Sequence, residues 1–461
     1  MATSKSITRH VVACPRRLAS TSVAQLAACR GRWQALLLIS LLAGVSPLVS
    51  AGSDATNLTL TAAVVLAIQS NPELASLRAK WEAMQERPAQ AGALPNPMFK
   101  YGGMDATEGG RWPNTGEKRF MVEQTFPWFG KRELRAQVAH ADVTIMQQDL
   151  ETMTRDVRMM VKEAYFDLQA VRQAATITRK DEEMLRRMAK LAEAMYTTGQ
   201  RTEQDVLKAK AESTMLQQRL LELAAQENTL QARLNTLLSR PADAPVGPLT
   251  EIPPLPAAAQ LQQLQAQAAA NRPEVRLATA RASRYDLERQ LMQKERLPDY
   301  QLGLEYRHIG RDADMVMVTI GVELPIWRDK SAAGVREAEL MQAASEASLT
   351  AARQRSAFDV QDAAFKLNTA RRTVELYRQE LVPQAEARFR TSEAGYQAGQ
   401  VDFMDLLESQ RFLLNARVMA VMAAGTLGMQ AASLERATGV PLDTDLATHP
   451  AAAELPPAAS P

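Results

Sequence analysis

Cysteine is almost absent from this chain of 461 residues, and aromatic residues make up only 5% of it. The two cysteines, Cys14 and Cys29, both precede residue 52. A chain that loses its N-terminal segment therefore has neither a thiol nor a disulfide. Glycine is also sparse, with 21 residues, whereas Ala, Gln, Leu, Glu and Arg are abundant. This composition is typical of long helices with exposed polar faces and not of an ordinary compact core.

An excess of charge of one sign is also missing. The chain has 54 Lys and Arg residues interspersed with 52 Asp and Glu residues, so its formal net charge is +2. No basic block of the kind that lines a nucleic-acid groove is present. We therefore expect no nucleic-acid partner.

Catalytic motifs are lacking as well. The sequence has no glycine-rich loop that could hold a phosphate, and His140, His308 and His449 are too scattered to form a pair by spacing. We expect neither an enzyme, nor a cofactor, nor a resident metal site.

Long apolar runs are confined to the N-terminal part of the chain. Arg30 and Arg32 precede an apolar core at 36–42, and small residues at 49–51 offer a cleavage site. This order is typical of a secretory signal. We expect residues 1–51 to be a leader and the remainder to be exported.

Two alternatives remain for this leader. It could stay as a transmembrane anchor, although the apolar run is short for a span and ends in Ser, Pro and Gly. Lipid attachment at Cys29 is the other, because residues 26–29 resemble a lipoprotein cleavage box. No later segment reaches the roughly 18 apolar residues of a spanning helix. We therefore expect the exported chain to enter a membrane only as strands.

The chain contains one unit written twice, at an offset of 200 residues. Tyr-Thr-Thr-Gly-Gln at 196–200 recurs as Tyr-Gln-Ala-Gly-Gln at 396–400, and Asp-Val-Leu at 205–207 recurs as Asp-Leu-Leu at 405–407. Such a match in the same order indicates a duplication. We expect the following division: leader 1–51, first copy 52–241, linker 242–255, second copy 256–442 and a disordered Ala/Pro-rich tail 443–461.

Each copy is predicted to contain a helix, two strands, a very long helix, a turn and a shorter helix. No proline lies between Pro127 and Pro241, and Gly199 is the only glycine between Gly130 and Pro241. Residues 131–198 can therefore form one helix of roughly 100 Å. Its apolar residues alternate steps of four and three, as in a coiled-coil seam: Met146, Leu150, Met153, Val157, Met160, Ala164, Val171, Ala174, Leu185, Met188, Ala192 and Met195. At this spacing, methionines pack in a core and do not bind metal.

The lengths of the shorter helices suggest how a helical cylinder with a wall of even height could form. We expect the helix that follows the first turn to stack end to end with the helix at 272–296, because together they match the long helix in length. By the same reasoning, the helix at 402–438 should stack with the one at 72–91. Pro383 should kink or restart the second long helix.

Two pairs of segments with period-two alternation lie between the helices. In the second copy, apolar residues alternate with largely polar ones: Tyr300, Leu302, Leu304, Tyr306, Val316, Val318, Ile320, Val322 and Leu324. Four strands cannot close a barrel, and an open sheet edge is not tolerated in lipid. Three copies would pool twelve strands, and their helices would equally form a ring, which predicts a homotrimer.

The fold class is therefore mainly α with a small β part: a long coiled-coil helical barrel and four strands per protomer in a trimeric twelve-stranded membrane barrel. The same alternation also suits a soluble, half-buried hairpin. A periplasmic coiled-coil scaffold or adaptor with a soluble β domain is thus the alternative.

The most specific segments resemble the TolC-like outer-membrane efflux family over residues 58–442. Glu-Gln-Thr-Phe-Pro-Trp-Phe-Gly-Lys-Arg at 123–132 is similar to the strand-to-helix junction of the branch paired with heavy-metal pumps, and the turns at 196–207 and 396–407 are similar to the family's tips. The resemblance implies an outer-membrane trimer with a large periplasmic tunnel. It also implies a periplasmic adaptor, an inner-membrane pump of the resistance-nodulation-division type, and heavy-metal cations as cargo.

The resemblance implies roles for four residues near the turns. Asp405 and Glu408 match acidic positions that ring the periplasmic entrance, and Asp205 and Tyr396 match positions whose contacts keep it closed. Three copies of each acid would attract cations. Val401 departs from the family pattern, because some members have a gating arginine there.

Simpler roles are open at these turns. Asp205 and Asp405 also suit the N-terminal turn of a helix, where an acid is favourable to the helix dipole. Gly199 and Gly399 are turn glycines, and with Gln200 and Gln400 they are the expected contacts of an adaptor.

Overall fold

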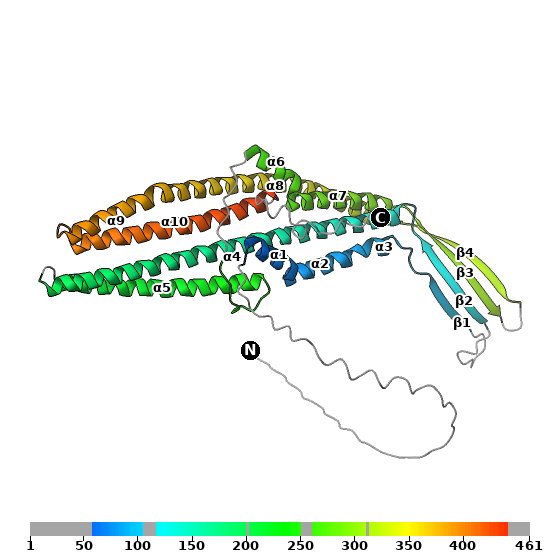
Figure 1. Cartoon of the computed structure of the whole chain (residues 1–461). Helices are drawn as coiled ribbons and strands as arrows, with labels where there is room; N and C mark the ends of the chain where they lie inside the picture. The colour runs from blue at the N-terminus through cyan, green and yellow to red at the C-terminus, as the bar shows by residue number, and fades with distance from the viewer. Residues whose placement is uncertain (1–57, 105–116, 200–201, 250–260, 310–312, 441–461) are drawn as a thin grey trace, which may run out of the picture. The chain divides into compact units, whose positions relative to one another are not determined.

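The structure, a computed structural model, describes residues 58–104, 117–199, 202–249, 261–309 and 313–440, all within the unit Ala55–Pro461. The expected leader at 1–51, Gln200 and the tail at 443–461 lie outside these residues. The helices and strands follow in chain order (Figure 1): α1 (Leu60–Ser70), α2 (Pro72–Gln85), α3 (Arg87–Gly92), β1 (Met98–Met104), β2 (Glu117–Phe126), α4 (Lys131–Thr197), α5 (Glu203–Leu237), α6 (Leu261–Asn271), α7 (Pro273–Lys294), β3 (Asp299–Ile309), β4 (Met315–Glu323), α8 (Arg328–Leu376), the π-helix η1 (Tyr377–Leu381), α9 (Val382–Gln397) and α10 (Phe403–Thr438).

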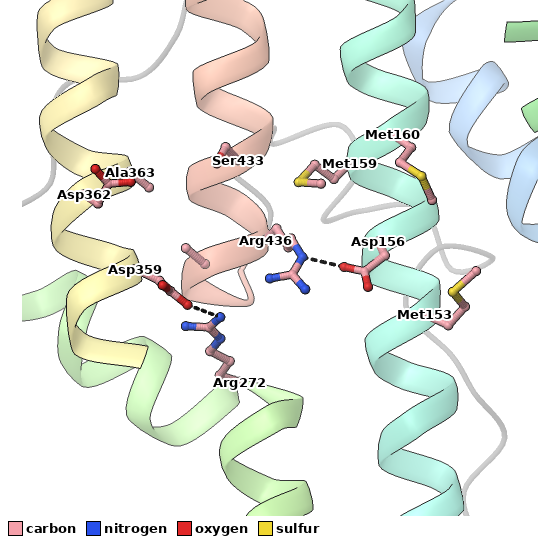
Figure 2. Close-up of a pocket in the computed structure, with 11 residues that line it drawn as sticks. Met153, Asp156, Met159, Met160, Arg272, Asp359, Asp362, Ala363, Ser433 and Arg436 are labelled. Carbon is pink, nitrogen blue, oxygen red and sulfur yellow. Dashed lines mark hydrogen bonds and ion pairs between the residues drawn. The ribbon is translucent and has the colours of Figure 1, made fainter. Parts of the chain in front are cut away.

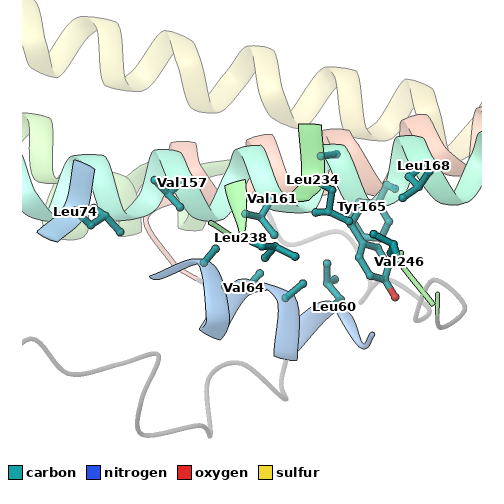
Figure 3. Packing of buried hydrophobic residues seen from close by; sticks show 14 of the residues in the cluster. Leu60, Val64, Leu74, Val157, Val161, Tyr165, Leu168, Leu234, Leu238 and Val246 are labelled. Atoms are coloured by element: carbon teal, nitrogen blue, oxygen red, sulfur yellow. The ribbon is translucent and has the colours of Figure 1, made fainter. Parts of the chain in front are cut away.

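The long helix predicted at 131–198 is confirmed by α4, which runs without a break for 67 residues. The predicted seam residue Val157, together with Val161 and Tyr165 beside the seam, is buried against α1, α2 and α5 (Figure 3). The Tyr165 hydroxyl donates to the Leu58 carbonyl at 2.9 Å. The buried cluster includes residues of α1, α2 and the end of α5. All of these elements therefore pack against the middle of α4.

The end-to-end pairing expected for the shorter helices is wrong. The end of α5 lies at the junction of α1 and α2, where the Ser70 hydroxyl donates to the Leu238 carbonyl at 3.0 Å. The end of α10 instead meets the start of α7, where Arg436 pairs with Glu274 at 3.3 Å. Figure 1 shows α10 followed by α7 along one line between α4 and α8. The pairing is exchanged because α10 enters the space between α4 and α8, and α7 fills the rest of that space.

The second long helix is interrupted near Pro383, as predicted. The α-helical pattern gives way to η1 at Tyr377–Leu381 and resumes in α9, whose first turn contains the proline. Proline lacks an N–H and clashes with the preceding turn, and a π-turn is one way to accommodate it.

The four strands form one antiparallel sheet in the order β1-β2-β3-β4. Rows across the sheet alternate in character. Phe99, Val122, Leu304 and Val318 are in register on one face. The opposite face carries ion pairs such as Lys100 with Glu123 at 2.5 Å. The sheet is therefore apolar on one side and charged on the other.

One expectation about apolar segments also needs correction. Among the described residues, α10 is long and apolar enough by length and composition to cross a membrane, although no later segment was expected to be. The small residues of α10 lie against neighbouring helices: Gly425 and Gly428 both approach Phe166 of α4. We interpret α10 as a packed helix of the bundle.

Replacing Gly428 with valine should destabilise this contact. A β-carbon at Gly428 would lie 2.6 Å from the Phe166 ring, and overpacking a tight interface costs about 1 to 3 kcal/mol. Chemical denaturation followed by circular dichroism should show the loss. The matched control is Thr426→Val, which places the same side chain at an exposed position two residues earlier. Equal stability of the two variants would contradict the packing described.

Candidate functional site

The two hairpin turns lie together at the end of the helices remote from the sheet (Figure 1). The second turn closes α9 with two backbone bonds: Gln400 N–H donates to the Gly395 carbonyl at 2.8 Å, and Gly399 N–H donates to the Tyr396 carbonyl at 3.1 Å. Gly399 has a φ of 74°, in the left-handed region that favours glycine. This is the Schellman arrangement, in which glycine satisfies the last carbonyls of a helix.

The first turn has similar geometry. Gly199 has a φ of 75° and donates to the Tyr196 carbonyl at 2.9 Å. The turn role expected for Gly199 and Gly399 is therefore confirmed in its geometry, while their contact with an adaptor stays a prediction.

Alanine at position 399 should weaken the second turn through the backbone alone. No atom of the described residues lies within 4 Å of the site of a β-carbon there, so the cost of about 1 to 2 kcal/mol comes from the left-handed conformation. Gly334→Ala is a control of opposite sign, because Gly334 lies within α8 without a positive φ, and alanine there should gain about 0.5 to 1 kcal/mol. Thermal unfolding of both variants measures the difference, and a shift of the same sign in both would refute it.

The four expected gate residues divide into two buried and two exposed ones. Tyr396 and Asp205 are buried, and the Tyr396 ring packs edge-on against Phe403 with centroids 5.5 Å apart. Asp405 and Glu408 are exposed on the first two turns of α10. Asp205 and Asp405 both lie in the first turn of their helices, which agrees with the dipole role. Their gating role stays a prediction.

A single apolar cluster joins the two hairpins behind these turns. It includes Met188 and Ala192 of α4, Val206 of α5, Phe389 of α9 and Leu406 of α10. Val401, at the position where an arginine was considered, packs its side chain against Gly395. The second hairpin is thus held on the first mainly by apolar contact.

Charged contacts between the hairpins lie farther from the turns. Arg411 of α10 donates through Nε to Glu212 of α5 at 2.8 Å. Within the second hairpin, Arg388 of α9 lies 3.9 Å from Glu408 of α10, a weak exposed pair that does not reach the first hairpin. The bonded pair therefore links α10 to α5, while Glu408 keeps an exposed carboxylate.

Asp181 and Gln410 form a further polar contact that the sequence analysis missed. Both side chains are buried, Asp181 on α4 and Gln410 on α10, and the Gln410 Nε2 donates to the Asp181 carboxylate. Burial raises the pKa of Asp181 to about 6, against the opposing effects of the Gln410 hydrogen bond and of Arg417. A gap in the seam could have revealed them: 181 continues the four-three spacing between Ala174 and Leu185, and 410 lies between Leu406 and Leu413.

A cavity of about 530 Å³ lies between α4, α8 and α10 near the start of α7. Arg272 donates to Asp359 at 2.6 Å, and Arg436 pairs with Asp156 (Figure 2). Met153 and Met160 also pack against the buried core. Across the described ranges, no group of three or more His, Cys, Asp or Glu side chains is arranged to hold a metal ion. The cavity is a charged junction between helices.

The junction between strand and helix explains the unusual segment at 123–132. Lys131 is buried, and its Nζ donates at 2.8 Å both to Asp299 and to the Leu297 carbonyl. The backbone N–H of Trp128 donates to the same carboxylate at 2.8 Å, and the Trp128 ring stacks on the Tyr300 ring with centroids 5.4 Å apart. These contacts join the junction between β2 and α4 to the junction between α7 and β3.

Comparison with known families decides the class of this fold. The model of the family described as "Outer membrane efflux protein" matches residues 63–240 and again 264–440. The chain belongs to the outer membrane efflux protein family. It is therefore an efflux protein of the outer membrane with a large periplasmic part, and its family is one of channels and not of enzymes. The alternative of a soluble periplasmic scaffold is excluded by this membership.

Individual relatives agree with the family. The chain is 25% identical over 394 residues to the cobalt-zinc-cadmium resistance protein CzcC of Cupriavidus metallidurans, covering 83% of this chain and 90% of that protein. The outer membrane protein VceC of Vibrio cholerae superposes with a TM-score of 0.70 at 18% identity, covering 83% of this chain and 97% of VceC. CusC superposes with a TM-score of 0.72 at 15% identity, covering 84% of this chain and 93% of CusC. The fold of this outer membrane efflux protein is thus that of the solved channels.

Proposed function

We propose that this protein is the passive outer-membrane duct of a tripartite efflux system and works as a homotrimer. Three protomers pool their strands into a twelve-stranded barrel, and their helices form a periplasmic tunnel. The observation that carries the proposal is the amphipathic sheet with β1 and β4 at its edges. In lipid such edges must be paired, and neighbouring copies supply the pairing.

The apolar face of the sheet supports contact with lipid. Ile320 is 76% exposed, and the row through Phe99, Val122, Leu304 and Val318 is also exposed. Lipid outside and water inside match the two faces of a membrane barrel.

The helices support the same closure. Exposed apolar residues lie on α5, at Leu207, Met215 and Leu221, and on α8, at Leu340, Phe358 and Phe365. Figure 1 shows these two helices on opposite sides of the pair α4 and α10. Two different surfaces that cover each other between copies give a ring when the rotation closes.

The duplicated unit, residues 52–241 and 256–442, provides two hairpins per protomer. The two separate matches of the family model support this division. We assign Asp405 and Glu408 to the acidic ring of the entrance, and Asp205 and Tyr396 to its closed state. The turns at Gly199, Gln200, Gly399 and Gln400 are the contacts for a periplasmic adaptor, which connects the duct to an inner-membrane pump of the resistance-nodulation-division type.

Heavy-metal cations are the proposed cargo. The similarity to CzcC, which is named as a cobalt-zinc-cadmium resistance protein, supports this choice, as does the exposure of Asp405 and Glu408. Cells that lack the gene should become more sensitive to these cations, and complementation with it should restore resistance. Unchanged sensitivity to every such cation would contradict the cargo but not the duct.

Reconstitution tests the duct itself. Detergent-extracted protein added to a planar lipid bilayer should give stepwise ionic currents of uniform size. Protein that inserts stably into vesicles yet gives no current in bilayers would contradict the proposed function.

A further inference from the structure

A buried acid lies between the two hairpins, about 27 Å along α4 from the first turn. The Asp181 side chain is 4% exposed and the Gln410 side chain is fully buried. Both occupy seam positions that apolar residues fill on either side, at Leu185 on α4 and at Leu406 and Leu413 on α10. A polar pair in such a seam costs stability, although it can fix register.

The hydrogen bonds of this pair are incomplete while the acid is ionised. The Gln410 Nε2 donates to the Asp181 Oδ2, but the buried Gln410 Oε1 has no hydrogen-bond partner among the described residues. A carboxylate can only accept hydrogen bonds, whereas a protonated carboxyl also has an O–H to donate. An amide and a carboxylic acid can therefore satisfy each other with two bonds, and an amide and a carboxylate cannot.

The surrounding charges do not neutralise Asp181. Glu212 of α5 disfavours its negative charge and Arg417 of α10 favours it. Both are engaged elsewhere: Glu212 with Arg411, and Arg417 with Glu386 of α9 at 2.7 Å. The adjacent Glu182 of α4 accepts from Arg186 at 2.5 Å and from Ser213 of α5 at 3.2 Å. Within the described part of the chain, Asp181 thus has an amide and not a cation as its hydrogen-bond partner.

We infer that Asp181 and Gln410 form a proton-operated clasp that holds the second hairpin against the first. Proton uptake by Asp181 completes the pair and favours the packed arrangement of α10 on α4. Loss of the proton leaves a buried charge and an unpartnered oxygen, and both favour separation of the hairpins. The inference rests on the proposed function, because separation of the hairpins at this end would widen the duct.

The direction of the effect follows from burial. The pKa of Asp181 is raised from 3.8 to about 6 in the packed arrangement, so protonation stabilises that arrangement. The stabilisation is fully present below the ordinary pKa and is lost as the pH rises through about 6. With a solvated Asp181 in the separated state, acidification from about pH 7.5 to about pH 4.5 favours packing roughly ten- to thirtyfold per protomer.

Asp181→Asn tests the clasp in the full-length protein. Asparagine keeps the shape and can donate to the Gln410 Oε1, but it does not titrate. In planar bilayers the open probability of the wild type should fall about tenfold or more on acidification, whereas the variant should stay low at both pH values. Glu183→Gln is the matched control, because it removes an exposed charge two residues away on α4 and should titrate as the wild type does.

Infrared spectroscopy provides a readout that does not need a channel. The wild type in detergent should gain a carboxylic-acid carbonyl band with a midpoint near pH 6, and Asp181→Asn should lack it. An equal band in both, or an equal pH response of their currents, would overturn the clasp. A wild type without current at any pH would instead overturn the proposed function, and the infrared result would still stand as a test of the proton site.

Discussion

Replacing Asp405 and Glu408 together with alanine is expected to weaken block of the channel by divalent cations about ten- to a hundredfold. Both carboxylates are exposed on α10 next to the second turn, and three protomers would bring six of them to one constriction. In water, one carboxylate a few Å from a divalent cation attracts it by about 2 kcal/mol, so the loss of a single such contact at the constriction already accounts for this range. Single-channel currents with increasing divalent cation on the periplasmic side measure the block.

The control for this experiment is Glu337→Ala with Glu339→Ala. These two acids are exposed near the start of α8, far from the turns, and their removal changes the net charge by the same amount. Block should be unchanged in the control. If both double variants lost block equally, the effect would come from overall charge and the acids at the second turn would not form the constriction.

Arginine in place of Ile320 is expected to prevent stable insertion into the membrane. Ile320 lies on the apolar face of β4, with Leu302 as its neighbour in register. Arginine on the lipid face of a barrel costs about 2 to 4 kcal/mol at the middle of the bilayer. We expect the heat-resistant oligomer to be lost from outer-membrane fractions on gels.

Thr319→Arg distinguishes the two faces of the same strand. Thr319 pairs with Gly303 on the charged face, where a barrel has water, so this variant should assemble normally. Assembly of both variants would show that neither face meets lipid. Failure of Thr319→Arg alone would show that the sheet is turned the other way.

The helices were largely predictable from the sequence because their signals are local. The proline gap between Pro127 and Pro241 and the seam spacing give α4 almost to the residue, and Pro383 marks the restart at α9. The alternation of apolar residues likewise gives β3 and β4. The sequence could not predict which short helices follow each other end to end, because their similar lengths suit either pairing. The pairing depends on the position of α10 between α4 and α8.

The site shows the same limit. Tyr196 and Tyr396 occupy equivalent places in the two turns, yet Tyr196 is 45% exposed and Tyr396 is 1% exposed. A repeat predicts the same local structure in both copies, and the backbone geometry of the two turns is indeed similar. Burial depends on what each hairpin packs against, as Tyr396 does against Phe403. The contact between Asp181 and Gln410 could not be predicted, because a coiled-coil seam is recognised from its apolar residues. A polar residue at a seam position only interrupts that pattern.

Native mass spectrometry of the protein extracted from outer membranes with detergent tests the account most directly. We predict a single species with three times the mass of the processed subunit, released only when detergent is present. A monomer recovered in the soluble periplasmic fraction without detergent would contradict the account, because a lone four-stranded sheet cannot close a barrel.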